Sequence, residues 1–232
     1  MRSACALGSV LLALLGIPTL ITATDSPADT ELAELQDLYK QRDFFSLRDR
    51  LDKLTGQERS RPQVGLLQAA VEQAFNVPAT SNQTIDSLHG AGGLGPGLAL
   101  QLRNLQLTNH LRLHEYPAAL EDARAILSSS AGDLAPRAVS EARNKLPLLE
   151  ALQDVPPQET EIRGPSRLAL GQTRRVPLEI AGQKVHFGLD TGANLSVIMR
   201  SEAERLGLKI RPAGIVISTS TAKKVVGDVT VA

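Results

Sequence analysis

An aspartate followed by a small hydroxyl residue and a glycine is the part of this chain best suited to chemistry. The segment is Asp190-Thr191-Gly192-Ala193, and in the stretch before it, residues 185–189, every second residue is apolar. That period predicts a strand with one buried face. A carboxylate at the end of an apolar strand is costly unless neighbouring donors or a shared proton support it. Gly192 permits a sharp turn that brings its amide close to whatever Asp190 holds.

The strand, the Asp-Thr-Gly-Ala loop and the apolar residues after it resemble the active-site segment of the retropepsin-like aspartic proteases. A hairpin before the loop and a helix carrying residues 203–208 extend the resemblance over residues 162–232. The resemblance implies that Asp190 is catalytic and that Thr191, Gly192 and Ala193 support the active-site loop. In this family the threonine hydroxyl locks two such loops together and the glycine amide holds the carboxylate.

The chemistry that the resemblance implies is hydrolysis of a peptide bond by a water held between two carboxylates. One carboxylate is ionised to take a proton from the water, and the other is protonated to donate to the peptide carbonyl. The chain contains one Asp-Thr-Gly, so a working site requires a homodimer in which each subunit contributes Asp190. The expected function is an aspartic endopeptidase (a hydrolase) acting on a peptide or protein, with no metal and no organic cofactor.

Two other interpretations of the same loop stay open. Residues 188–192 with Ser196 are similar to the phosphate loop of the actin and Hsp70 ATPases, although those proteins need a large two-lobed fold. Alternatively, the loop is a structural turn in a degenerate protease domain. The protein would then be a non-catalytic binding module.

The first residues predict a targeting segment. Residues 4–21 are uncharged and mostly apolar, Arg2 gives a positive end, and Ala23 offers a small residue for cleavage. We expect residues 1–23 to be a signal peptide and the protein to be exported, periplasmic or secreted. An uncleaved anchor is the alternative. Cys5, the single cysteine, lies inside this segment, so the mature chain has no thiol for a disulfide, a metal or catalysis.

Composition argues against nucleic acid as a partner. The chain has 25 basic and 25 acidic residues, no tryptophan, two tyrosines and four phenylalanines. A net charge near zero gives no attraction to nucleic acid or to an anionic membrane, and few aromatic rings are present to stack on bases. We therefore expect contact with a membrane only through the leader segment.

Residues 24–153 show the apolar period of helices rather than strands. Phe44 and Tyr116 begin similar apolar patterns 72 residues apart, which corresponds to two repeats of about 34–36 residues. A middle repeat begins at Pro62. The pattern resembles a tetratricopeptide-like array of helical hairpins. Its surface is expected either to hold a protein partner or to serve only as a packed spacer.

Three motifs in this helical region have competing interpretations. Residues 90–95 match the dinucleotide fingerprint, but no strand precedes them, so we expect a loop before a helix near Pro96. His110 and His114, four residues apart, could share a metal, although a solvated helix face is the simpler interpretation. The sequon at Asn82 would matter only in a eukaryotic secretory pathway.

After a proline-containing linker, residues 154–165, the apolar period changes to two. A first strand around Leu168, and a hairpin with its turn at residues 181–184, are expected before the catalytic loop. A short helix should follow, opened by a capping box of Ser201 and Glu204 and ended by Gly207. A second hairpin, residues 215–231, would correspond to the flap of the proteases.

The fold class expected is therefore a multidomain α+β protein. An N-terminal α-helical hairpin array is followed by an all-β retropepsin-like domain over residues 166–232. The later family segment, two apolar residues and a glycine behind the catalytic loop, is not found before Ala232. We expect the protease domain to be C-terminally incomplete and residues 1–232 alone to be inactive, with a degenerate domain as the alternative.

Overall fold

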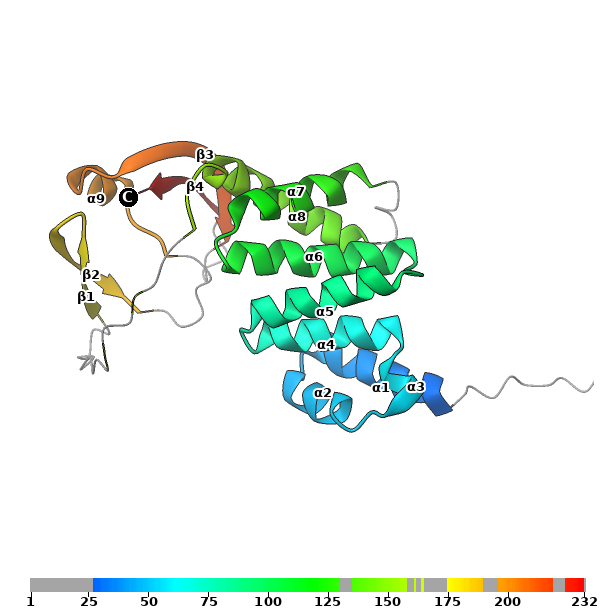
Figure 1. Ribbon diagram of the computed structural model, residues 1–232. Coiled ribbons are helices and arrows are strands. Elements are labelled where there is room, and N and C mark those ends of the chain that lie inside the picture. Colours follow the sequence, from blue (N-terminus) through cyan, green and yellow to red (C-terminus); the bar gives the residue numbers. More distant parts are fainter. Residues whose placement is uncertain are drawn as a thin grey trace, which may run out of the picture.

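The protein was analysed as a computed structural model (Figure 1), which describes residues 27–129, 135–157, 161, 164, 175–189, 196–218 and 224–231. The helices of the first part are α1 (Pro27–Gln41), α2 (Phe44–Leu51), α3 (Gly56–Arg59), α4 (Pro62–Ala74), α5 (Pro78–Ala91), α6 (Pro96–Arg112), α7 (Tyr116–Ser128) and α8 (Pro136–Leu152). The second part contains β1 (Arg175–Ile180), β2 (Gln183–Gly188), α9 (Arg200–Arg205), β3 (Lys209–Ser218) and β4 (Lys224–Val231).

Three helical hairpins, α1–α2, α4–α5 and α6–α7, share one turn geometry. Their turn residues Arg42, Asn76 and His114 have φ angles of 60°, 61° and 60°. The residue after each turn residue donates its amide to a carbonyl of the preceding helix, at 2.8–3.0 Å. Phe44 and Tyr116, aligned from the sequence, therefore occupy equivalent positions at the start of α2 and α7. This confirms an N-terminal array of helical hairpins.

The hairpins stack one on the next (Figure 1) and are joined by three apolar clusters. One cluster joins α1, α2 and α4 around Leu35, a second joins α4, α5 and α6 around Leu102, and a third joins α6, α7 and α8 around Leu149. Because α4 and α6 each belong to two clusters, every hairpin is packed against the next. Such a stack is stabilised by contacts between neighbouring units rather than by a single central core.

The loop expected at residues 90–95 is confirmed in part. Helix α5 runs on to Ala91, Gly92 and Gly93 turn the chain with φ angles of 73° and 72°, and α6 begins at Pro96 as expected. Helix α5, and not a strand, leads directly into these glycines, so the strand–glycine loop–helix arrangement of a dinucleotide site is not formed at this position.

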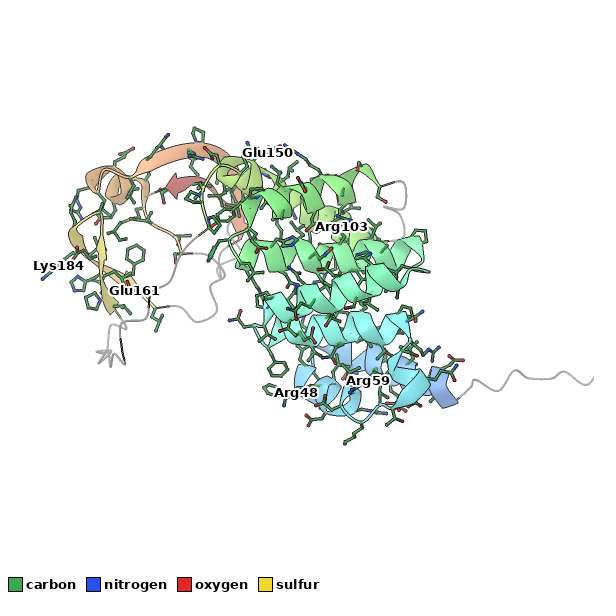
Figure 2. All side chains as sticks on the ribbon, in the orientation of Figure 1. Arg48, Arg59, Arg103, Glu150, Glu161 and Lys184 are labelled. Carbon is green, nitrogen blue, oxygen red and sulfur yellow. The ribbon has the colours of Figure 1, made fainter. Side chains whose placement is uncertain are left out.

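Strands β1 and β2 form an antiparallel hairpin with a two-residue turn. Ala181 and Gly182 have φ angles of 50° and 74°, the geometry that fits the twist of two adjacent strands. The expected four-residue turn was too long, because Gln183 and Lys184 already pair with Ile180 and Glu179 in the ladder. Figure 2 shows Lys184 at the outer edge of this hairpin. The strand expected around Leu168 lies outside the described residues.

The short helix and the second hairpin after the catalytic loop are present with two corrections. Met199 rather than Ser201 is the N-cap of α9 and makes no side-chain cap bond, so the capping box is wrong. Gly207 ends the helix as expected, with a φ of 72°. Strand β3 begins at Lys209, earlier than expected, because it pairs with β4 on both sides of a register shift between residues 211 and 215.

Within the described residues, the strands form two separate two-stranded sheets. Figure 1 shows β3 and β4 next to α8. Among the described helices, none has both the length and the apolar character needed to cross a bilayer.

Candidate active site

The expected site residues 190–193, which include Asp190, lie outside the described residues. The structure describes the two ends of their loop, Leu189 after β2 and Ser196 before α9. The described elements nearest to these residues in the chain are β2 before them and α9 and the β3–β4 hairpin after them.

Strand β2 delivers the chain to the loop with part of the predicted alternation. Val185 is buried, with 6% of its surface exposed, and Phe187 is half-buried. Leu189, expected on the same face, is 50% exposed. Burial of this face therefore decreases toward the loop, because Leu189 lies beyond the last paired residue of a two-stranded sheet and has few neighbours to cover it.

The chain leaves the loop through a short apolar segment. Val197 and Met199 are 63% and 75% exposed, and residues 196–199 form no regular secondary structure. The apolar residues that follow the Asp-Thr-Gly-Ala segment are therefore not in a strand in the described part of the segment. Helix α9, by contrast, is anchored by Ala203 and Leu206, which are buried.

The β3–β4 hairpin, expected to be the flap, carries an apolar pair on its surface. Val216 and Val226 face each other in the ladder and are 59% and 71% exposed. Leu189, Val197 and Met199, on either side of residues 190–195, are exposed as well. The tip of the hairpin, residues 219–223, lies outside the described residues.

Asp228 on β4 is a structural acid that the sequence did not single out. Its carboxylate accepts a hydrogen bond from the Ala213 amide at 3.1 Å and pairs with Arg200 at the start of α9. The Ala213 amide and Arg200 hold the pKa of Asp228 below its ordinary value. A carboxylate that stays ionised and is bonded to both an amide and an arginine is suited to holding the hairpin and not to carrying a catalytic proton.

A groove runs along the first helices of the hairpins. Its volume is about 340 Å³, and it is lined by residues of α1, α4, α6 and α8 with the loop before α8, namely Tyr39, Leu66, Gln73, Gln101, Asn104, Leu105, Thr108, Ala135, Pro136, Arg137, Ala138 and Glu141. Asn104 donates its amide to Glu141 at 2.9 Å, while its Oδ1 is buried with no hydrogen-bond partner among the described residues. The groove thus contains an unused acceptor.

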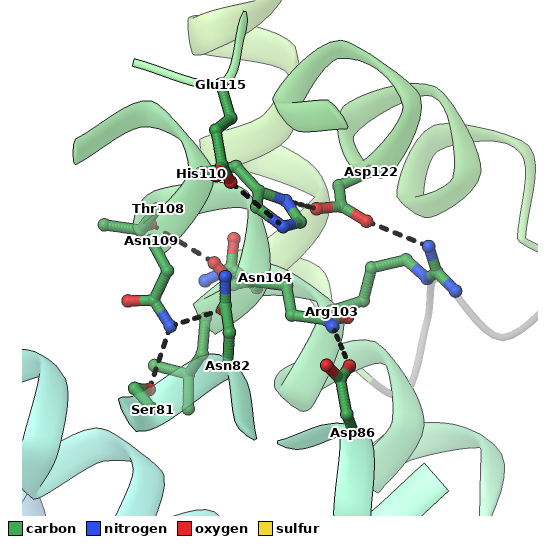
Figure 3. Close-up of polar contacts among 12 residues, drawn as sticks. Ser81, Asn82, Asp86, Arg103, Asn104, Thr108, Asn109, His110, Glu115 and Asp122 are labelled. Atoms are coloured by element: carbon green, nitrogen blue, oxygen red, sulfur yellow. Dashed lines mark hydrogen bonds and ion pairs between the residues drawn. The ribbon is translucent and has the colours of Figure 1, made fainter. Parts of the chain in front are cut away.

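The two histidines considered as metal ligands contact different partners, and Figure 3 shows those of His110. His110 on α6 lies 2.8 Å from Asp122 and 3.8 Å from Glu115, whereas His114, in the turn after α6, contacts the Tyr116 hydroxyl at 3.1 Å. A shared helix face was wrong because α6 ends at Arg112, and a solvated face was wrong because the His110 side chain is only 19% exposed. No cluster of three metal-binding side chains occurs in the described residues.

We expect His110 to make the stability of the helical array depend on pH. Its hydrogen bond to Asp122 raises the pKa of His110 above its ordinary value, against burial, which lowers it. Because the pKa of His110 is higher in the folded state than in the unfolded state, its protonation stabilises the fold. This stabilisation is complete at pH values below the unfolded-state pKa of about 6.5, and it is lost as the pH rises through the folded-state pKa. The free energy of unfolding should therefore fall as pH increases from mildly acidic to alkaline.

Chemical unfolding at a series of pH values measures this effect. His110→Gln should remove most of the decline in this window, whereas the same change at the exposed His89 should leave it in place. An unchanged pH profile in His110→Gln would contradict the assignment.

The comparisons with known proteins bear on the second part of the chain. Residues 176–232 match the model of a family described as aspartyl protease. No curated protein and no solved structure matches the chain. The matched residues begin in β1 and include β2, the Asp190 loop, α9 and the β3–β4 hairpin. The match therefore supports a retropepsin-like aspartyl protease domain in this part of the chain.

Proposed function

We propose that the protein is an aspartic endopeptidase whose site is assembled from Asp190 of two identical subunits. The observation that carries the proposal is the family match over the residues that surround Asp190. The paired carboxylates share a proton, so that one takes a proton from the attacking water while the other donates its proton to the peptide carbonyl. The Thr191 hydroxyl and the Gly192 amide hold the two loops, with Ala193 completing the turn. No metal or organic cofactor takes part.

The exposed apolar side chains support the dimer. Leu189 and Val197 flank the loop and are half-exposed or more, as are Val216 and Val226 on the hairpin. A second subunit and a peptide substrate would cover these side chains and remove them from water, which is favourable by about 25 cal/mol per Å² of apolar surface. The β3–β4 hairpin is then the element that closes over the peptide.

Peptide cleavage by the complete gene product, including any residues encoded after Ala232, tests this proposal. A library of unstructured peptides should be cut by the wild type and not by Asp190→Asn. Equal cleavage by both proteins would rule out catalysis by this carboxylate.

The groove on the helical array favours a second candidate function, a protein-binding module. The Oδ1 of Asn104 has no hydrogen-bond partner among the described residues, and a small rotation of this side chain into the groove would let it accept from a peptide N–H. In this account the helical domain, residues 24–153 and tetratricopeptide-like, binds a protein partner while the protease domain, residues 166–232 after a linker, is degenerate. Binding that is unaffected by Asp190→Asn, together with no cleavage by the wild type, would favour it.

We further propose that the protein is exported after removal of residues 1–23. The uncharged apolar stretch behind Arg2 and a mature chain without cysteine support this location. N-terminal sequencing of the exported material should begin near Thr24. Intact Met1 on protein recovered from the cytosol would contradict it.

A further inference from the structure

The last helix of the array is tied to the β3–β4 hairpin by one arginine. Arg211 on β3 donates its Nη1 to the carbonyl oxygen of Ala151 at 2.9 Å and also bonds the carboxylate of Asp154. Ala151 lies in the last turn of α8, where carbonyl groups have no partner within the helix. A guanidinium placed there satisfies one such carbonyl and complements the negative end of the helix dipole.

The same arginine marks the point where the hairpin changes register. The shift in pairing between β3 and β4 begins at Arg211, and Gly214 within it has a φ of 59°. Asp228 holds the shifted segment by accepting from the Ala213 amide, and Arg200 pairs with Asp228. Arg200 begins α9, the first element after the Asp190 loop. A series of polar contacts therefore leads from the end of α8 through the hairpin to the exit of the active-site loop.

The arginine end of this connection is the more enclosed one. The Arg211 side chain is 24% exposed and that of Asp154 is 66% exposed, and the contact with Arg211 lowers the pKa of the Asp154 carboxyl, which keeps the pair charged. Arginine suits this role because its planar group can satisfy a carbonyl and a carboxylate at the same time. Lysine would provide the charge without the fixed geometry.

We propose that Arg211 is a positioning residue that fixes the base of the β3–β4 hairpin on the end of α8. The helical array thereby sets how the hairpin closes over a peptide. This inference rests on the proposed protease function. Arg211 acts through the hairpin and does not touch the reacting atoms. If the hairpin is released, ordering it costs free energy each time a peptide binds, so KM rises while kcat stays close to its wild-type value.

Steady-state kinetics of the complete gene product test the effect on substrate binding. Arg211→Ala and Asp154→Ala should each raise KM about threefold to tenfold, with kcat changed by less than about twofold. Arg211→Glu combined with Asp154→Arg restores a pair of opposite charges and should recover a lower KM than Arg211→Glu alone. Arg143→Ala is the matched control, because Arg143 is an exposed arginine on α8, the helix that Arg211 contacts. This change should leave KM unchanged.

Amide hydrogen exchange gives a readout that does not depend on catalysis. Arg211→Ala should speed exchange in β3 and β4 and leave α6 and α7 as in the wild type, whether or not Asp190→Asn is also present. If the wild type cuts no peptide, the proposed protease fails while the exchange result still tests the anchor. Unchanged exchange in the hairpin, an unchanged KM, or a double variant no better than Arg211→Glu alone would each overturn the inference.

Discussion

Replacing Asp190 with asparagine is expected to lower kcat by roughly 10³-fold or more in the complete gene product. An amide can neither take a proton from water nor share one with the opposing residue, so both subunits lose the group that the reaction needs. Asparagine has nearly the same shape as aspartate, so the fold should survive. Peptide cleavage under single-turnover conditions measures the loss at the chemical step.

Asp228→Asn is the matched control for this change. It alters another acid of the same domain, one that is engaged with Ala213 and Arg200 and that we assign to holding the hairpin. Its effect on kcat should be far smaller than that of Asp190→Asn. A loss of equal size in both variants would indicate general damage to the domain rather than removal of a reacting carboxylate.

Truncating Leu149 to alanine should destabilise the helical array by about 2–5 kcal/mol. Leu149 on α8 is fully buried among side chains of α6, α7 and α8, and its loss leaves a cavity in the cluster that joins them. Unfolding by urea, followed by circular dichroism, gives the change in the free energy of unfolding.

The neighbouring Glu150 provides the control. It lies on the same helix, is exposed and labelled in Figure 2, and pairs with Arg124 only at 3.8 Å. Glu150→Ala should change the free energy of unfolding by no more than about 0.5 kcal/mol. If Leu149→Ala were equally mild, α8 would not be an integral part of the array.

The helices could be predicted from the sequence because their signals are local. Pro62, Pro78, Pro96 and Pro136 each stand at the first position of a helix, where a missing amide costs nothing. The apolar period then identifies the buried face of each helix. The equivalence of Phe44 and Tyr116 follows from the same local pattern, since each begins a helix after a turn residue with positive φ.

The contacts that connect the elements could not be predicted, because they join residues far apart in the chain. Arg211 meets Ala151 across 60 positions, and His110 meets Asp122 only because α6 and α7 fold back on each other. The apparent capping box at Ser201 shows the opposite failure. The motif is present, but α9 begins at Arg200, so Ser201 already lies inside the helix and cannot occupy the cap position.

For the candidate site, the sequence predicted the flanking elements but not the contacts between them. The hairpin before Asp190 and the helix after it are formed by the residues expected, because strand alternation and a terminal glycine are local signals. The role of Asp228 escaped prediction, since an isolated acid on a strand has no distinguishing pattern until its partners Ala213 and Arg200 are known.

Subunit mixing tests the central claim, that two Asp190 carboxylates from two chains make one catalytic site. Wild type and Asp190→Asn are combined at constant total concentration, under conditions in which subunits exchange, and the rate of peptide cleavage is followed. If a site with a single carboxylate is inactive, the rate falls with the square of the wild-type fraction, to about one quarter in an equal mixture. A rate that falls linearly, to about one half at the same point, would contradict the shared site.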